Sequence, residues 1–359
     1  MIRLLIVDDS PLVRLLLTDL FRGAGDFTVA VARSGEEALA ALPVFRPNVV
    51  TLDITMPGMS GLACLDRIMV ERPCPVVMVS ALTTEGAEET VEAMALGAVA
   101  FVPKPRGALS LELPAAAEEM VSTVRAAAGV RLSRTTRLAE RVRLHRARAL
   151  AGHPTDPVPR PAPPQGRPVQ GGLVLIGCST GGPPALDAIL PALPAGFASP
   201  IVIAQHMPAS FTGPLARRLD RICAIGVEEL TGPTILQPRR AYIARGDGDV
   251  LISRRQGAVA AMPAPGSPDH HWHPSVDRMV ASALGIVAPE RLVGVLLTGM
   301  GTDGVAAMTE LKAKGGRTVA EAEETAVIWG MPGALVRGGG ADFVTPLDGI
   351  ARLLATLAG

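Results

Sequence analysis

The sequence predicts two α/β domains: an N-terminal (βα)5 domain and a C-terminal domain with a mostly parallel sheet, joined by an Arg- and Pro-rich linker. Three observations lead to this fold class. The chain has 359 residues, too many for one core of ordinary size. Short runs rich in Val and Ile alternate with amphipathic stretches in both halves. An arginine-rich and then a proline-rich stretch separates the halves. We place the domains at 1–127 and 172–359, with the linker at 128–171.

The composition is that of a globular protein without a strongly charged partner. Hydrophobic residues make up 48% of the chain and charged residues 19%, and the formal net charge is zero. A chain without net charge has no overall field to attract nucleic acid or an acidic membrane. The cysteines have neither a Cys-x-x-Cys pair nor the spacing of a metal site, which is typical of a reducing cytosol; they are Cys64, Cys74, Cys178 and Cys223.

Neither a membrane span nor an export signal is expected. No apolar run approaches the roughly 18 residues of a spanning helix. The first ten residues, MIRLLIVDDS, reach two aspartates after a short apolar run, whereas a secretory signal has a distinct apolar core and a small-residue cleavage site. We therefore predict a cytoplasmic protein that is not inserted in a membrane.

The N-terminal half carries five predicted strands. Their apolar runs are RLLIVDD, FTVAVA, NVVTLDI, PVVMVSA and AVAFVPK, and helical patterns such as SPLVRLLLTDLFRGAG and GAEETVEAMALGA lie between them. Strands that alternate with helices form a parallel sheet covered on both faces. Ligand sites in such sheets lie at the carboxyl ends of the strands.

Polar side chains fall where these strands end. Asp8 and Asp9 follow the first strand, Asp53 ends the third, Ser80 the fourth, and Lys104 follows the fifth. One polar residue at a strand end is ordinary, but a whole set at one sheet edge is not. Three converging carboxylates would repel one another without a cation, and a hard, oxygen-seeking ion such as Mg²⁺ suits that role. A nearby lysine suits a phosphoryl oxygen.

This half resembles a response-regulator receiver domain over essentially its whole length. The resemblance implies that Asp53 accepts a phosphoryl group and that Asp8 and Asp9 bind Mg²⁺ together with it. It further implies three switch residues. Ser80 supplies the switch hydroxyl, Phe101 is the aromatic ring that changes rotamer, and Lys104 contacts the phosphate.

The segment 128–171 differs in kind from both halves. VRLSRTTRLAERVRLHRARALAGH is arginine-rich and compatible with a helix, and PTDPVPRPAPPQGRPVQGG cannot form a core. An arginine run raises the possibility of nucleic-acid binding. The sequence has no recognisable DNA-binding motif and no interleaved aromatic residues to stack bases, so we favour a solvated helix face and expect no nucleic-acid partner.

The C-terminal half returns to alternating strands and helices. GLVLIG, PIVIAQ, RAYIARG, DVLISR, RLVGVLLTG, RTVAEA and ADFVT are predicted strands, and PPALDAILPAL and DGVAAMTELKAKG are predicted helices. The stretch ARGDGDVLI predicts a hairpin that turns at Gly-Asp-Gly-Asp. The pattern indicates a mostly parallel sheet with antiparallel additions.

The stretch IGCSTGG follows the first strand of this half. Residues Gly177 to Gly181 read Gly-x-Ser-x-Gly, the pattern of a strand-to-helix turn that presents a nucleophilic serine, here Ser179. A nucleophile needs a base and an orienting carboxylate. His206 follows the strand PIVIAQ, and Asp303 follows the strand RLVGVLL within a glycine-rich turn, so these residues are the predicted partners.

Each of these signals is weak by itself, and other readings exist. The same loop is compatible with an anion-binding turn or with a turn that only needs small residues. A phosphate-binding loop is disfavoured because Gly-Lys-Ser/Thr is missing, and a dinucleotide site because the glycine spacing is wrong. Two other classes of function stay open at this point: a response regulator whose output is binding alone, and a nucleotide- or phosphate-binding module.

Five motifs, in order, resemble chemotaxis protein-glutamate methylesterases, the CheB family. They are IGCSTGGPPAL, QHMPASFTGPLARRLD, HPSVDRM, LLTGMGTDGVAAM and WGMPGAL, and the resemblance covers nearly the whole chain. It implies a phosphorylation-activated enzyme with the catalytic triad Ser179, His206 and Asp303. The implied substrates are glutamate methyl esters, and also glutamine amides, on methyl-accepting chemoreceptors, and the implied phosphodonor is the chemotaxis histidine kinase.

The esterase chemistry needs no metal or organic cofactor in this reading, and Mg²⁺ belongs to the receiver. The developing oxyanion requires N–H donors, and the backbone groups of Thr180 and Met300 are the candidates because each adjoins a glycine-rich turn. The chain departs from the common family pattern at four positions outside the triad: Cys178, His273, Glu321 and Ala322.

Overall fold

The computed structural model describes residues 1–80, 84–104, 114–130 and 172–358. The backbone divides into two compact units, one within residues 1–159 and one within residues 160–359. Of the predicted linker, residues 131–171 lie outside the described residues.

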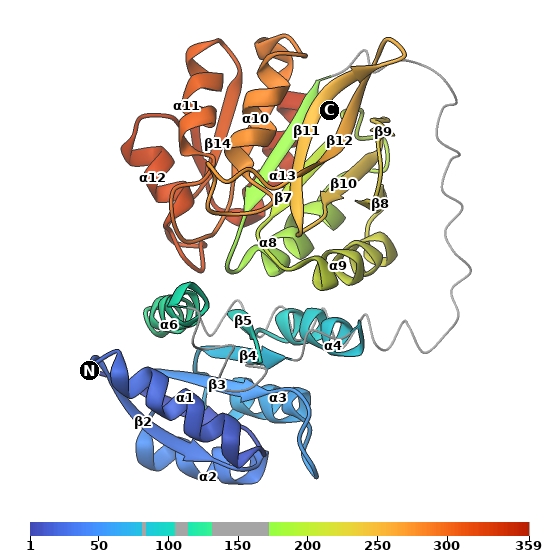
Figure 1. The fold of residues 1–359 in the computed structure, drawn as a ribbon. Coiled ribbons are helices and arrows are strands. Elements are labelled where there is room, and N and C mark those ends of the chain that lie inside the picture. Colours follow the sequence, from blue (N-terminus) through green and yellow to red (C-terminus); the bar gives the residue numbers. More distant parts are fainter. Residues whose placement is uncertain (81–83, 105–113, 131–171, 359) are drawn as a thin grey trace. The chain divides into compact units, whose positions relative to one another are not determined.

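The first unit is a five-stranded parallel sheet with helices between its strands, as predicted (Figure 1). The sheet order is β2-β1-β3-β4-β5. The strands are β1 (Ile2–Val7), β2 (Phe27–Ala32), β3 (Val49–Asp53), β4 (Val76–Ser80) and β5 (Ala100–Pro103). The described helices are α1 (Pro11–Gly23), α2 (Gly35–Phe45), α3 (Gly61–Glu71), α4 (Thr84–Ala95) and α6 (Pro114–Ala128).

Serine caps begin three helices of this unit directly after the loops that leave the strands. Ser10, Ser34 and Ser60 each have extended backbone, and each side chain accepts a hydrogen bond from the backbone N–H three residues later. β1 and β3 are neighbours, although the chain forms β2 between them. The strand order therefore reverses between β1 and β3, and an open α/β sheet places its binding crevice at such a point.

The second unit is built on a seven-stranded sheet in which every pair is parallel. Its order is β15-β14-β13-β6-β7-β10-β8. The strands are β6 (Leu173–Cys178), β7 (Ile201–Gln205), β8 (Gly226–Leu230), β10 (Arg240–Ala244), β13 (Leu292–Leu296), β14 (Arg317–Glu321) and β15 (Phe343–Thr345). The chain winds to one side of β6 first and to the other side from β13 onward, so the order reverses between β6 and β13.

Helices cover both faces of this sheet (Figure 1). On one face α10 (Val276–Leu284), α11 (Val305–Ala313) and α12 (Met331–Arg337) pack in sequence, and on the other α8 (Gly182–Ile189) packs against α9 (Ala209–Ile222) and α13 (Leu347–Ala358). The core between the sheet and α10, α11 and α12 is formed by buried side chains that include Leu175, Val202, Val280, Met308 and Leu335. No helix in the described part of the chain is long and apolar enough to cross a membrane.

The predicted hairpin at Gly-Asp-Gly-Asp is wrong. β10 lies in the parallel sheet, whereas β11 (Gly248–Arg255) pairs antiparallel with β12 (Ala258–Pro265) in a separate three-stranded sheet with β9 (Thr234–Ile235). The hairpin turns instead at Gln256 and Gly257, which both have positive φ. Two positive φ values are what a two-residue turn between twisted strands requires, and the glycine makes this turn possible.

Candidate functional site

Ser179 is the first residue after β6 and opens a tight turn into α8. Its backbone N–H donates to the Thr298 carbonyl at 3.0 Å, and its own carbonyl accepts from the Gly182 N–H at 2.8 Å. Gly181 has φ +82, and a Cβ on Gly182 would lie 1.9 Å from the Gln205 Oε1 atom. The glycines are therefore required by backbone conformation and by close packing, and the turn holds the serine half-exposed above the sheet.

His206 is the first residue after the neighbouring strand β7. Its backbone N–H donates to the Cys178 carbonyl at 2.9 Å, which places the histidine beside the nucleophile turn. The buried Gln205 side chain links the two segments, because its Nε2 donates to the carbonyls of Ser179 at 2.9 Å and His206 at 3.0 Å. The sheet thus brings the predicted nucleophile and base to adjacent strand ends.

Asp303 lies in the turn after β13 and pairs with His206, with Nε2 2.9 Å from Oδ2. Its carboxylate sits at the amino end of α10, where it accepts from the N–H groups of Val276 at 2.7 Å and Asp277 at 3.1 Å and from the Ser275 hydroxyl at 3.0 Å. Burial by itself would raise the pKa of Asp303, but the hydrogen bond and charge of His206 and the backbone donors hold that pKa below its usual range.

The serine and the histidine are not hydrogen-bonded to each other. Within the described residues the Ser179 hydroxyl makes no hydrogen bond, and the buried Nδ1 atom of His206 has no partner. Because Nε2 faces Asp303, Nδ1 is the nitrogen that is available to accept a proton. The Trp272 ring lies over the imidazole, with ring centroids 5.7 Å apart and planes inclined by 11°.

The two predicted oxyanion donors both have available N–H groups. In the described part of the chain, the backbone N–H groups of Thr180 and Met300 donate to no acceptor. The loop that carries Met300 passes very close to the nucleophile, since a Cβ on Gly299 would lie 2.8 Å from the Ser179 Cβ. Donors from both sides therefore flank the serine, as stabilisation of an oxyanion requires.

Two departures from the family pattern have clear structural roles. Cys178 is fully buried, and its thiol contacts the Gln205 side chain at 3.0 Å; burial strongly raises the thiol pKa, so a reactive thiolate is disfavoured. His273 Nδ1 lies 3.0 Å from the buried Asp249 carboxylate, which also binds Arg278 and accepts from the Ser275 N–H at 2.7 Å. Asp249 thereby anchors the loop that leads into α10.

Several residues that shape the site were missed by the sequence analysis. Ser275, Val276 and Asp277 supply the donors to Asp303, and Gln205 joins two strand ends. A serine directly before an amphipathic helix, as in HPSVDRM, is the signal of a helix start and hence of an anion-binding end. Glu321, the buried residue that ends the strand RTVAE, has no local sequence pattern of this kind, because polar residues are common at strand ends.

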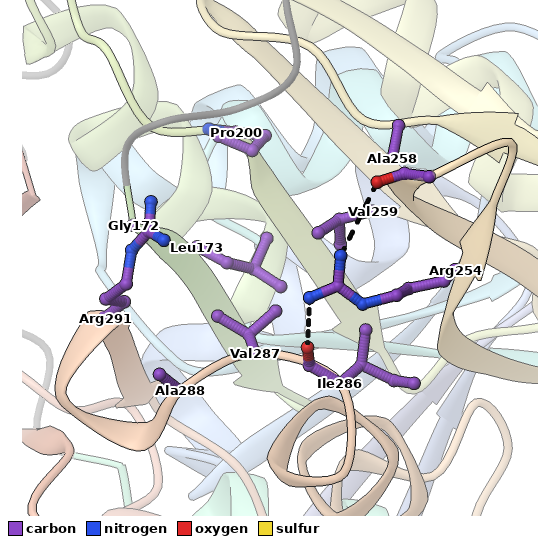
Figure 2. Close-up of a pocket in the computed structure, with 11 residues that line it drawn as sticks. Gly172, Leu173, Pro200, Arg254, Ala258, Val259, Ile286, Val287, Ala288 and Arg291 are labelled. Atoms are coloured by element: carbon purple, nitrogen blue, oxygen red, sulfur yellow. Dashed lines mark hydrogen bonds between the residues drawn. The ribbon is translucent and has the colours of Figure 1, made fainter.

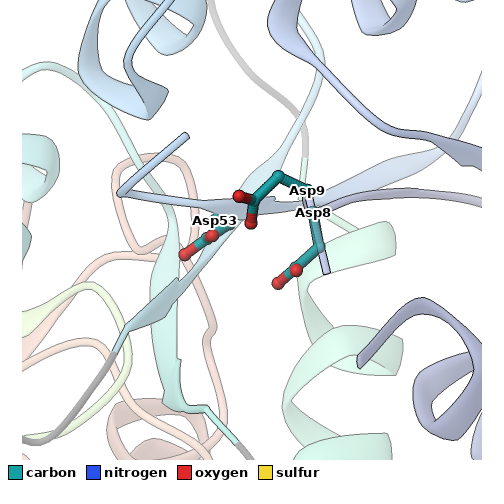
Figure 3. Close-up of side chains that lie close together, drawn as sticks. All are labelled: Asp8, Asp9 and Asp53. Carbon is teal, nitrogen blue, oxygen red and sulfur yellow. The ribbon is translucent and has the colours of Figure 1, made fainter. Parts of the chain in front are cut away.

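A second cluster lies at the carboxyl edge of the first unit. Figure 3 displays the three carboxyl groups of Asp8, Asp9 and Asp53 at the ends of β1 and β3, and one oxygen of each lies within 4.8 Å of the others. Asp8 and Asp53 are buried, whereas Asp9 is exposed. The Lys104 Nζ atom lies 2.8 Å from Asp53 Oδ2 and 3.1 Å from Asp8 Oδ2. These residues meet as the sequence predicts.

The electrostatics of this cluster favour a cation. Burial raises the pKa of both Asp8 and Asp53, and Lys104 offsets only part of that effect. The buried Asp8 Oδ2 accepts no hydrogen bond within the described residues, although Lys104 lies nearby. An unsatisfied carboxylate oxygen in a compact oxygen donor set is suited to Mg²⁺.

The remaining predicted switch residues lie on the adjacent strands. Ser80 ends β4, where it is paired with Pro103, and its side chain is outside the described part. Phe101 lies in β5, half-buried against the core of the unit. β4 lies next to β3, and β5 lies beyond β4 at the end of the sheet.

A cavity of about 190 Å³ lies elsewhere in the second unit (Figure 2). Its lining includes Leu173 at the start of β6 and the Arg254 side chain, whose guanidinium donates to the Ile286 carbonyl at 3.2 Å. Six residues of extended strand, about 20 Å, separate Leu173 from Ser179. The cavity is therefore remote from the serine.

Comparisons with known proteins agree with this architecture. Residues 4–113 match the response regulator receiver domain family, and residues 174–354 match the CheB methylesterase family. The protein-glutamate methylesterase/protein-glutamine glutaminase 2 of Rhodopseudomonas palustris is 53% identical, covering 98% of this chain and 96% of its own length. The protein-glutamate methylesterase/protein-glutamine glutaminase 3 of Rhodospirillum rubrum is 50% identical, covering 99% of this chain and 95% of its own length. The crystal structure of the Thermotoga maritima CheB methylesterase catalytic domain matches 53% of this chain and all of its own, with 39% identity and a TM-score of 0.51.

Proposed function

The chain belongs to the CheB methylesterase family, and on that premise we propose that it is a phosphorylation-activated protein-glutamate methylesterase and protein-glutamine glutaminase. Its substrates are glutamate methyl esters and glutamine amides on the cytoplasmic domains of chemoreceptors. The division into a receiver at 1–127, a linker at 128–171 and a catalytic domain at 172–359 is part of this proposal. The observation that carries it is the His206–Asp303 pair beside Ser179 at the carboxyl edge of the sheet.

The proposed reaction proceeds through an acyl-enzyme. The Ser179 oxygen attacks the γ-carbonyl carbon of the ester while His206 Nδ1 takes its proton, and the charge of Asp303 stabilises the resulting imidazolium. The N–H groups of Thr180 and Met300 donate to the oxyanion. The carbon–oxygen bond to the methoxy group breaks, and the proton on Nδ1 leaves with methanol.

Hydrolysis of the acyl-enzyme repeats these steps with water. His206 Nδ1 takes a proton from the water, whose oxygen bonds to the acyl carbon, and the proton then returns to the Ser179 oxygen as the acyl bond breaks. The product is a glutamate carboxylate. A glutamine substrate follows the same path, with ammonia as the leaving group in place of methanol. The small residues around the serine suit such small leaving groups.

The receiver is proposed to control this chemistry. Asp53 accepts a phosphoryl group from the phosphohistidine of the chemotaxis histidine kinase: an Asp53 oxygen forms the new bond to phosphorus as the phosphorus–nitrogen bond breaks and the kinase histidine is released. Asp8, Asp9 and Asp53 would hold Mg²⁺, which neutralises phosphoryl oxygens when it is bound. Lys104 contacts the phosphoryl group, and two further residues, Ser80 and Phe101, act as the switch.

Methanol release tests the proposal. The purified full-length chain is incubated with receptor cytoplasmic fragments methylated at their glutamates, with Mg²⁺ and a small-molecule phosphodonor. We expect methanol to be released in step with the loss of methyl groups, and matched fragments with alanine at the methylation sites to give none. Release no faster than without enzyme would overturn the proposal.

A further inference from the structure

We propose that Glu321 is a positioning residue for the nucleophile turn, acting through Thr298. This inference rests on the proposed function, because it assigns a role within the same site. Glu321 ends β14, and its side chain is fully buried. The Oε2 atom accepts a hydrogen bond from the Thr298 N–H at 2.8 Å.

Thr298 connects this carboxyl group directly to the turn that carries the nucleophile. Its carbonyl accepts from the Ser179 N–H at 3.0 Å, and its hydroxyl donates to the Thr180 carbonyl at 2.8 Å. Thr298 is itself buried, so its polar groups depend on these protein partners. Thr298 thus binds Glu321 on one side and both turn residues on the other, including Thr180, one of the two proposed oxyanion donors.

The surroundings of Glu321 supply hydrogen bonds without a countercharge. The Thr325 hydroxyl, in the loop after β14, lies 3.0 Å from the Oε1 atom, and the Leu347 N–H at the start of α13 donates to that hydroxyl. No charged side chain in the described part of the chain offsets the carboxylate. The titratable neighbour is Cys178, a thiol whose pKa is raised first by burial and then by Glu321.

This arrangement accommodates the carboxyl group in two protonation states. When Glu321 is ionised, the Thr325 hydroxyl donates to Oε1. When Glu321 is protonated, its own O–H donates to Thr325, whose proton can turn to the Ala322 carbonyl, 3.3 Å away. The Thr298 N–H donates to Oε2 in both states, but that bond is charge-assisted only in the ionised state and is then roughly twice as strong.

Both states are populated near neutral pH, because burial raises the pKa of Glu321 to about 7. Ionisation therefore tightens the bond that holds Thr298, and with it the turn at Ser179, as the pH rises through neutrality. Because Glu321 is fully buried, substrate has no access to it, and we expect the effect on turnover and not on binding. We expect kcat to follow this ionisation while KM stays constant.

The test compares wild type with Glu321→Gln from pH 5.5 to 9. The amide keeps an acceptor for Thr298 and a donor for Thr325, and it imitates the protonated state at every pH. Titrations that both proteins share cancel in the ratio of their kcat values. We expect the kcat of wild type divided by that of Glu321→Gln to be near one at pH 5.5. It should rise about two- to five-fold toward pH 9, with a midpoint near pH 7. KM should be equal in both proteins.

Glu324→Gln is the matched control, since Glu324 is exposed in the same loop. Its kcat ratio to wild type should be flat, and a flat ratio for Glu321→Gln would overturn the inference. A second variant, Thr325→Val, removes the hydroxyl that donates to the ionised Glu321 carboxylate. The midpoint of its kcat–pH profile should therefore lie at higher pH than the wild-type midpoint. An unmoved midpoint would overturn the inference even if Glu321→Gln failed to fold. The proposed function fails separately, if methanol release is insensitive to Ser179→Ala.

Discussion

The Nε2 atom of His206 lies 2.9 Å from the Oδ2 atom of Asp303, and this pairing decides which imidazole nitrogen can act as the base. Since Nε2 carries the proton that Asp303 accepts, the lone pair is on Nδ1, which is buried and without a partner. The best-known serine hydrolases use these nitrogens in the opposite order. Ser179 follows the central strand β6, His206 follows β7 on one side of it, and Asp303 follows β13 on the other side.

Replacement of Ser179 by alanine is expected to abolish methanol release and leave the fold intact. Alanine fits the same turn, whose backbone bonds to Thr298 and Gly182 do not involve the hydroxyl. The loss in kcat should be on the order of 10³ or more. Ser253→Ala is the control, because Ser253 lies on the separate three-stranded sheet. If more than a tenth of the activity remained, another nucleophile would have to be sought.

His206 and Asp303 should act as one unit with the serine. The double variant Ser179→Ala/His206→Ala is expected to lose little more activity than either single variant, because effects within a triad are strongly non-additive. Asp303→Asn should lower kcat by about 10⁴, since the amide no longer holds the imidazole in the required tautomer. Steady-state methanol release measures each of these variants. Losses that multiply in the double variant would contradict the assignment.

The fold was predictable because both sheets are parallel and buried. Strands such as VVTLD and LVLIGC are continuous apolar runs, and amphipathic helices separate them. The prediction of strands failed where the strands are not buried on both faces. β8 is an edge strand with two glutamates, and β12 is rich in alanine and proline, so neither has the pattern of a buried strand. The hairpin was assigned to the wrong glycine turn because several turns satisfy the same local rule.

The site was predictable only as far as strand ends reveal it. Ser179, His206 and Asp303 each follow an apolar run, so their convergence follows from the parallel topology. The groups that we propose to orient them come from remote segments: Ser275 from a helix start and Glu321 from the end of a fourth strand, β14. No local pattern relates those positions to the triad, because their contacts depend on how the segments pack in three dimensions.

The stability of the second unit should depend on pH through Glu321. Its folded-state pKa is about 7, above the ordinary glutamate value of 4.5. Such a group contributes stability below pH 4.5, and that contribution is lost as the pH rises through 7. The loss is on the order of 3 kcal/mol at pH 8. Glu321→Gln should therefore raise the melting temperature of this unit relative to wild type at pH 8 but not at pH 5. A difference independent of pH, measured by calorimetry, would contradict this prediction.

Phosphorylation of Asp53 should raise methanol release by the full-length protein, and removal of Mg²⁺ should abolish the response. A phosphoryl group adds roughly one to two negative charges and three acceptor oxygens beside Asp8 and Lys104. Lys104, which now lies 2.8 Å from Asp53 Oδ2, must then share its donors with the new oxygens. The contacts of the two states are unequal, and only unequal contacts shift a conformational equilibrium. Allosteric coupling typically shifts an equilibrium by about 5- to 150-fold, and we expect the stimulation of methanol release to lie within that range.

The measurement is methanol release with and without acetyl phosphate, in Mg²⁺ or in excess EDTA. Wild type should respond only when the phosphodonor and Mg²⁺ are both present. Asp53→Ala should stay at the unstimulated rate, because it has no oxygen to accept the phosphoryl group, while Asp19→Ala, at an exposed position on α1, should respond like wild type. The basal rate without phosphodonor should be the same in EDTA as in Mg²⁺, since the proposed ester hydrolysis uses Ser179, His206 and backbone donors. Stimulation of Asp53→Ala to the wild-type level would show that the acidic cluster does not control the enzyme.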